Sequence, residues 1–91
     1  MRNSEEIAHV ICEIEKRLSD KRVNRYVNAP VKEGYLKAIE ILRGGRLVGI
    51  DKAHIDELKT TQGRAIAVLA IDYLNEEIEE KVLLNVPIKG F

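Results

Sequence analysis

The sequence contains few of the residues on which crosslinks and large aromatic cores depend. It has no tryptophan, one phenylalanine, three tyrosines and a single cysteine, Cys12. A core with so few aromatic side chains must be aliphatic, and a lone cysteine excludes an internal disulfide. The apolar run that includes Ile66 to Ile71 is far shorter than the roughly 20 residues of a membrane-spanning helix. These absences exclude a disulfide-rich scaffold and a transmembrane protein.

The N-terminal residues of the sequence do not resemble a secretory signal. Glu5 and Glu6 stand where the apolar stretch of a signal peptide would begin. Together with the single cysteine, this predicts a cytoplasmic protein without a membrane partner. Ninety-one residues make one small domain, which buries a smaller fraction of its surface than a larger domain does. We therefore expect residues 1–91 to form a single helical domain that gains stability by self-association.

Two helices are predicted in the first half of the chain. Apolar residues recur at spacings of three and four over Ser4–Leu18, with Asn3 or Ser4 as the N-cap. A second helix is predicted over Pro30–Arg43, because proline suits a first helical turn and two glycines follow Arg43. The eleven residues between the two helices, 19–29, have no helical period, and we expect part of this connection to run extended.

A third helix is predicted from Asp51 onward. Asp51 is a good N-cap, and Ile50 and Ile55 have the spacing of a hydrophobic staple around it. The β-branched residues and the glycine within residues 60–63 leave two alternatives open, one long helix or two helices in succession. In either case, the second part is expected to run from Arg64 to Lys81.

Within that second part, the run from Ile66 to Ile71 puts apolar side chains on every side of the helix. Such a segment must be surrounded by protein, and two other helices of one chain cannot easily cover all of its sides. We therefore predict an all-α bundle of three principal helices, completed by a homodimer. Self-association is assigned to Ile66, Leu69, Ala70, Tyr73 and Leu74.

The C-terminal segment from Val82 to Phe91 is apolar, and Pro87 forbids a helix around it. An apolar segment of this kind is unfavourable in water, so we expect an extended tail that docks on the chain's own helices or on a partner. The tail residues assigned to partner contact are Val86, Ile88 and Phe91.

Charge is unevenly distributed although the formal net charge is zero. Residues 1–46 carry ten Lys and Arg against seven Asp and Glu, whereas residues 47–91 carry five against eight. The basic residues are concentrated between Lys16 and Tyr26, a segment that we call the basic arm. The basic arm can contact the acidic residues 72–80 of a second subunit, or it can bind the phosphates and bases of a nucleic acid. The zero net charge argues against the second interpretation. The basic arm consists of Lys16, Arg17, Lys21, Arg22, Arg25 and Tyr26.

Metal-binding patterns are weak. Glu6 with His9, and Asp51 with His54, place a carboxylate and an imidazole three residues apart, a spacing that some helical metal sites use. Ordinary surface residues are the more frequent origin of such pairs. Cys12 flanks the apolar stripe of the first helix, and we expect a buried or half-buried thiol without catalytic function.

Three carboxylates near the end of the third predicted helix form another candidate metal site. Asp72, Glu76 and Glu79 would share one helical stripe and could hold Mg²⁺ in a helical phosphohydrolase, but the second helix offers no matching acidic pair. No catalytic, cofactor-binding or metal-binding residue is therefore assigned. The sequence favours a non-enzymatic protein-interaction module of regulatory or adaptor type that acts as a helical homo-oligomer. The alternatives are a nucleic-acid-binding regulator that uses Lys16 to Arg25, and the Mg²⁺-dependent phosphohydrolase.

Overall fold

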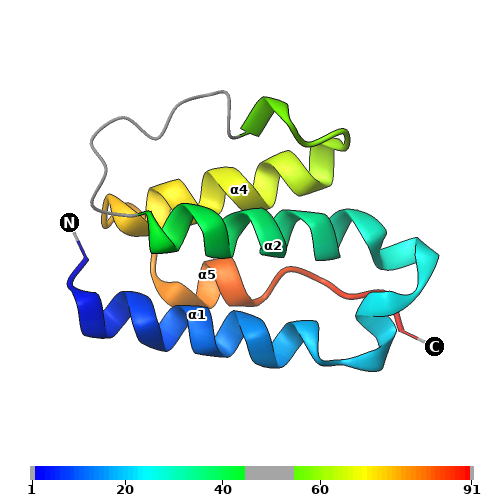
Figure 1. Ribbon diagram of the computed structural model, residues 1–91, viewed down its shortest axis with the longest axis horizontal. Coiled ribbons are helices and arrows are strands. Elements are labelled where there is room, and N and C mark those ends of the chain that lie inside the picture. The colour runs from blue at the N-terminus through cyan, green and yellow to red at the C-terminus, as the bar shows by residue number, and fades with distance from the viewer. Residues whose placement is uncertain (1, 45–54, 91) are drawn as a thin grey trace.

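Helices form the regular structure of the protein. The computed structural model describes residues 2–44 and 55–90, and within these ranges the chain contains no β-strand (Figure 1). The all-α prediction is confirmed for this part of the chain. No helix in the same ranges is long and apolar enough to cross a membrane. In chain order the elements, with η for a 3₁₀ helix, are α1 (Ser4–Leu18), η1 (Lys21–Asn24), η2 (Tyr26–Asn28), α2 (Ala29–Arg43), α4 (Thr61–Leu74) and α5 (Glu80–Leu84).

Helix α1 has the bounds that its sequence predicts. The side-chain oxygen of Asn3 accepts a hydrogen bond from the Glu6 backbone N–H at 2.9 Å, and the Glu6 carboxylate accepts one from the Asn3 N–H at 3.4 Å. This reciprocal pair is a capping box. Val10 and Ile14 on the apolar stripe are fully buried. The start and the buried face of α1 are therefore set by its local sequence.

The core is centred on the contact between α2 and α4, which lie side by side (Figure 1). Two glycines allow their close approach. A Cβ atom on Gly34 would lie 2.8 Å from the Cβ of Ile66 and 3.0 Å from the carbonyl oxygen of Gly63. Helix α5 contacts both α1 and α4 and buries Leu83. Helix α2 of the same chain therefore covers much of the apolar run that the sequence analysis assigned to a second subunit.

The second part of the third predicted helix starts earlier than expected. Helix α4 begins at Thr61, because the Thr60 hydroxyl accepts a hydrogen bond from the Gly63 N–H at 3.0 Å and caps the helix. Gly63 thus lies in the first helical turn and contacts α2, and it does not break the helix. Residues 57–60 are not helical, which excludes the alternative of one continuous helix.

The predicted helix end at Lys81 is wrong, because α4 ends at Leu74 and a turn precedes α5. Arg2 holds this turn. Its Nε donates to the carbonyl oxygen of Tyr73 at 3.1 Å, and its Nη2 donates to that of Ile78 at 2.8 Å. The guanidinium also lies 4.5 Å from the centre of the Tyr73 ring. These contacts satisfy carbonyl groups at the helix end and join the start of the chain to it.

The connection between α1 and α2 contains two 3₁₀ helices, η1 and η2, where the prediction had part of it extended. Asp20 caps η1 by accepting a hydrogen bond from the Arg22 N–H at 2.9 Å. Asn28 is 1% exposed and donates to the carbonyl oxygens of Arg22 at 2.8 Å and Lys89 at 2.9 Å. It also accepts from the Lys89 N–H at 2.8 Å. One amide side chain thus joins the connection to the C-terminal segment.

Residues 85–90 follow α5 without regular structure. The Arg17 Nη2 on α1 donates to the carbonyl oxygen of Val86 at 2.6 Å, and Val86 and Ile88 pack partly buried against the core. Residues 82–84, which the prediction placed in the extended tail, belong to α5 instead. The predicted features that lie outside the described residues are Ile50, Asp51, His54 and Phe91.

Candidate functional site

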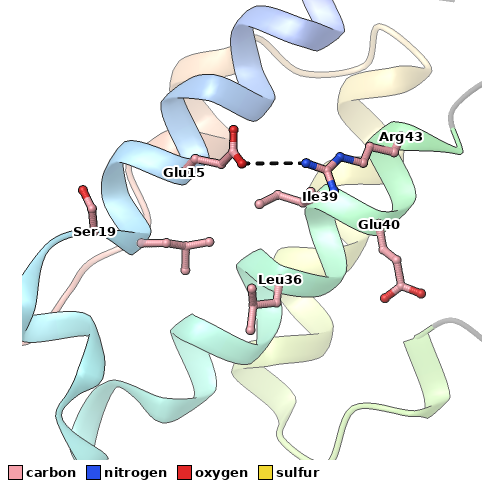
Figure 2. A pocket seen from close by; sticks show the side chains of 7 residues that line it. Glu15, Ser19, Leu36, Ile39, Glu40 and Arg43 are labelled. Carbon is pink, nitrogen blue, oxygen red and sulfur yellow. Dashed lines mark ion pairs between the residues drawn. The ribbon is translucent and has the colours of Figure 1, made fainter.

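An apolar groove of about 570 Å³ lies between the C-terminal half of α1 and α2, and we call it the α1–α2 groove (Figure 2). Its apolar lining comes from Leu18, Leu36 and Ile39. Ile39 belongs to the core and is 8% exposed, whereas Leu36 is 51% exposed. A leucine that remains half in water has hydrophobic free energy still to gain from burial in a complex.

Charged side chains of both signs line the edge of the α1–α2 groove. Glu15 of α1 and Arg43 of α2 form an ion pair across it, with 3.7 Å between Oε2 and Nη2 (Figure 2). Glu40 lies 3.0 Å from the Nζ of Lys37, which also binds Glu57 at 2.6 Å. The hydrogen bonds to Glu57 and Glu40 raise the pKa of Lys37. These contacts hold Glu40 at the groove while more than half of its side chain stays in solvent.

The basic arm is partly neutralised within the chain. Lys16 Nζ lies 3.0 Å from Glu13 Oε1, and Arg22 Nη2 lies 2.6 Å from Asp20 Oδ2. The side-chain hydrogen bond from Arg22, together with the one from its backbone N–H, lowers the pKa of Asp20 to about 2. Lys16 and Arg22 therefore have anionic partners, Glu13 on α1 and Asp20 at the N-cap of η1, and their charges are already compensated.

Arg17 is used by the fold itself. Its guanidinium binds the Val86 carbonyl and lies 5.4 Å from the centre of the Tyr35 ring. The Tyr35 hydroxyl is buried and donates to the Leu83 carbonyl oxygen at 2.7 Å. Burial raises the pKa of Tyr35, and the charge of Arg17 opposes this shift. Arg17 and Val86, which the sequence analysis assigned to partner contact, thus bind each other within one chain.

The remaining members of the basic arm extend into solvent. Tyr26 is 94% exposed, and Lys21 and Arg25 have no ion-pair partner among the described residues. Lys32, near the start of α2, reaches back to η1, where its Nζ donates to the Asn24 side-chain oxygen at 2.8 Å. The α1–α2 connection lies at the opposite end of the molecule from the turn between α4 and α5 (Figure 1). We call this surface the basic end, and its residues are Lys21, Arg25, Tyr26 and Lys32.

The residues assigned to self-association lie mostly inside a single chain. Leu69 is partly buried, and the neighbouring Val68 is the large apolar side chain of α4 that is substantially exposed, at 41%. A second copy can therefore contact the exposed side of the apolar run, at Val68, but not the side that packs against α2. Of the five residues assigned to self-association, the four that are at most 3% exposed are Ile66, Ala70, Tyr73 and Leu74.

The carboxylates considered for Mg²⁺ do not share one helical stripe. Asp72 lies on α4, Glu76 lies in the following turn with a φ of 60°, and Glu79 is the N-cap of α5. The predicted stripe required a helix that continues to Lys81, and it is wrong because α4 ends earlier. Glu79 instead lies 3.8 Å from Arg2. Within residues 2–44 and 55–90, no three His, Cys, Asp or Glu side chains are grouped as metal ligands would be.

His9 and Cys12 both face solvent. The predicted exposure of His9 is confirmed, and its Nε2 lies 3.5 Å from a carboxylate oxygen of Glu80. Glu6, the residue paired with His9 by spacing, lies 3.2 Å from Arg2. Cys12 is exposed, so the expectation of a buried or half-buried thiol is wrong.

Sequence reasoning missed the α1–α2 groove. Leu18 belongs to the apolar stripe predicted for the first helix. The second predicted helix carries Val31, Tyr35, Leu36, Ala38, Ile39 and Leu42, and the breadth of this apolar set was the available signal. No protein family matches the sequence, and no curated protein or solved structure is significantly similar to it. The function is therefore inferred from the geometry and charge of these surfaces.

Proposed function

We propose that the protein is a non-enzymatic interaction module of regulatory or adaptor type, which pairs with a second copy of itself through the α1–α2 groove. The observation that carries this proposal is Leu36, an apolar side chain 51% exposed beside an apolar groove on the same face. An interface with two-fold symmetry needs a projecting side chain and a hollow to receive it on one surface, because each copy supplies both.

The charges at the groove edge support a second copy as its occupant. Glu15 and Glu40 are negative and Arg43 is positive, and their side chains are 55%, 63% and 66% exposed. A strongly acidic or strongly basic partner would meet a like charge at one of these positions. A second copy brings the same mixed set of charges, so opposite signs can be paired across the interface.

Burial contributes more than charge to such a pair. Fully burying a leucine side chain contributes about 1.5–3 kcal/mol, and Leu36 has about half of that still to gain. An exposed ion pair contributes about 0–1 kcal/mol. The leucines of the two copies therefore drive association, and the charged residues set how the copies are aligned.

Leu36→Asp tests the proposal by sedimentation equilibrium. The wild-type protein should show a mass that rises with concentration toward twice the 10.3 kDa of one chain. Leu36→Asp should keep the mass of one chain at the same concentrations, because two charged side chains would replace the buried leucines. Val82→Asp is the matched control, since Val82 is 44% exposed on α5, away from the groove, and this variant should pair like the wild type.

Val68→Asp discriminates between the two candidate interfaces. Val68 is 41% exposed and marks the outer side of the apolar run in α4. Pairing that survives Leu36→Asp but is lost in Val68→Asp would place the interface on α4 and contradict the groove. A wild-type chain that keeps the mass of one chain at high concentration would reject self-association altogether.

A further inference from the structure

We infer that the basic end binds single-stranded nucleic acid, with Tyr26 stacking on an unpaired base while Lys21, Arg25 and Lys32 contact phosphates. This site lies outside the α1–α2 groove, and its contacts do not require two copies of the chain. Its ligand class includes RNA and single-stranded DNA, which share phosphates and accessible base faces.

Positive charge accumulates at this end of the molecule. Residues 16–32 contain six Lys or Arg and one Asp. Lys21 and Arg25 have no ion-pair partner among the residues the structure describes. The hydrogen bond of Lys32 goes to the neutral side chain of Asn24 and leaves its charge uncompensated. Three cations are thus available to attract a polyanion.

Tyr26 differs from the other two tyrosines in the chain. Tyr35 and Tyr73 are 0% and 3% exposed, and their hydroxyls donate to the carbonyl oxygens of Leu83 at 2.7 Å and Glu6 at 3.4 Å. Tyr26 is 94% exposed and contributes nothing to the core. An aromatic ring in water, adjacent in the chain to Arg25, offers a face for base stacking, which depends little on base identity.

The backbone that carries these side chains is fixed before any ligand binds. Asp20 caps η1 through the Arg22 N–H at 2.9 Å. Asn28, which ends η2, is buried and binds the backbone of both Arg22 and Lys89. Because the backbone of this connection is ordered without a ligand, binding costs less conformational entropy than it would in a flexible loop.

Element length favours a single strand over a duplex. The basic end is carried by 3₁₀ helices of four and three residues and by Lys32 near the start of α2. The exposed residues that follow Lys32 on α2 begin with Glu33, Leu36 and Glu40, which do not suit the phosphates and base edges of a major groove. Base stacking on Tyr26 also requires an unpaired base. An acidic protein surface would engage the three cations but would leave the tyrosine ring without a function, so a nucleic acid accounts for more of the site.

Fluorescence anisotropy with labelled oligo-dT and oligo-U of about 8 nucleotides tests the inference and separates DNA from RNA. From about 50 mM salt upward, the logarithm of the association constant should fall against the logarithm of the salt concentration with a slope near −2. About 0.7 of this slope is expected for each of three phosphate contacts. Tyr26→Ala should weaken binding by about 5- to 100-fold, whereas Tyr26→Phe should stay close to the wild type. The double variant Lys21→Gln with Arg25→Gln should reduce the slope to about −0.7. Lys81→Gln, an exposed cation on α5, is the control and should have no effect.

Several results would overturn the inference. The first is no binding of either oligonucleotide at low salt, and the second is binding that Tyr26→Ala leaves unchanged. Poly-glutamate bound as tightly as the oligonucleotides, without any effect of Tyr26→Ala, would assign the site to an acidic protein instead. Leu36→Asp should bind the short oligonucleotides like the wild type, so failure of this site and failure of the groove proposal are separable.

Discussion

A few polar side chains join parts of this chain that are far apart in sequence. Arg2 binds the turn after α4, Tyr35 binds the carbonyl of Leu83, and Asn28 binds Lys89. None of these roles is visible in the local sequence, because periodicity and capping patterns report neighbours within about one helical turn. At this scale the sequence analysis predicted the exposure of His9 but not that of Cys12, and it predicted none of these long-range partners.

Asn28 should contribute strongly to stability. It is 1% exposed and makes three hydrogen bonds to backbone groups of Arg22 and Lys89. Asn28→Ala leaves those partly buried groups without their protein partner, so we expect a loss of about 1–3 kcal/mol in the free energy of unfolding. Urea denaturation measures it. Asn24→Ala, an exposed neighbour, should change stability by less than about 0.5 kcal/mol, and equal effects of the two variants would contradict the structural role of Asn28.

Asp20 should titrate well below an ordinary aspartate. Its pKa is lowered to about 2, first by the Arg22 side chain and then by the Arg22 backbone N–H. A lowered native pKa means that the ionised carboxylate favours the folded state. This contribution is present above the unfolded pKa of about 3.9 and is lost as the pH falls toward 2.

Carbon NMR of the Asp20 carboxyl checks this expectation. The midpoint should lie near 2 in the wild type and should rise in Arg22→Gln, which removes the side-chain partner but keeps the backbone bond. Lys21→Gln serves as the neighbouring control, because Lys21 has no part in the shift. A wild-type midpoint close to 3.8 would show that the Asp20–Arg22 contact does not persist in solution.

At the scale of elements, the sequence predicted α1 and nearly all of α2, but it misplaced both ends of α4. Helix α1 has its capping box and its apolar stripe within its own residues, so local information suffices. Helix α4 starts at a threonine cap and ends where Arg2 binds the turn. Gly63 shows the same limit, since a glycine within an apparent helix break proved to be a site of close helix packing.

Gly34→Ala should destabilise the protein although alanine favours helices over glycine by about 1 kcal/mol. The added Cβ would lie 2.8 Å from the Ile66 Cβ and 3.0 Å from the Gly63 carbonyl oxygen, so α2 and α4 must separate. We expect a net loss of about 1–3 kcal/mol, which lowers the melting temperature by at least about 4 °C.

Thermal unfolding with Gly90→Ala as the control checks the packing argument. A Cβ on Gly90 meets nothing within 4 Å, so this variant should melt like the wild type. A Gly34→Ala variant that melts higher than the wild type would mean that helix propensity outweighs the steric contact. The close approach of α2 and α4 would then not be required for stability.

At the scale of the whole molecule, opposite charges lie at opposite ends. The basic end and the turn between α4 and α5 are separated along a molecule that is 38 Å long (Figure 1). The sequence predicted halves of opposite charge but left open whether the two would meet. Among the described residues, no ion pair joins the basic arm to residues 72–80, because each cluster has its charged partners at its own end of the molecule.

The candidate interaction surfaces were predictable only in part. The basic arm was identified from its residues, but its sequence did not indicate that the Arg17 guanidinium binds the Val86 carbonyl of the same chain. The run from Ile66 to Ile71 indicated correctly that apolar side chains needed cover. Periodicity indicates which sides of a helix must be covered, but it does not say which element covers them. Here α2 of the same chain packs against α4, and Ile66, Ala67 and Ala70 are buried. The α1–α2 groove arises from the relative placement of two helices, which no single helix pattern encodes.

Pairing through the α1–α2 groove is tested most directly by isotope-filtered NMR on a mixture of labelled and unlabelled chains. Cross-peaks between the Leu36 methyl groups of one copy and the methyl groups of Leu18 or Ile39 of the other are expected, because the exposed leucine should occupy the groove of its partner. Intermolecular cross-peaks confined to Val68, or none at concentrations where the chain is paired, would show that the groove is not the interface.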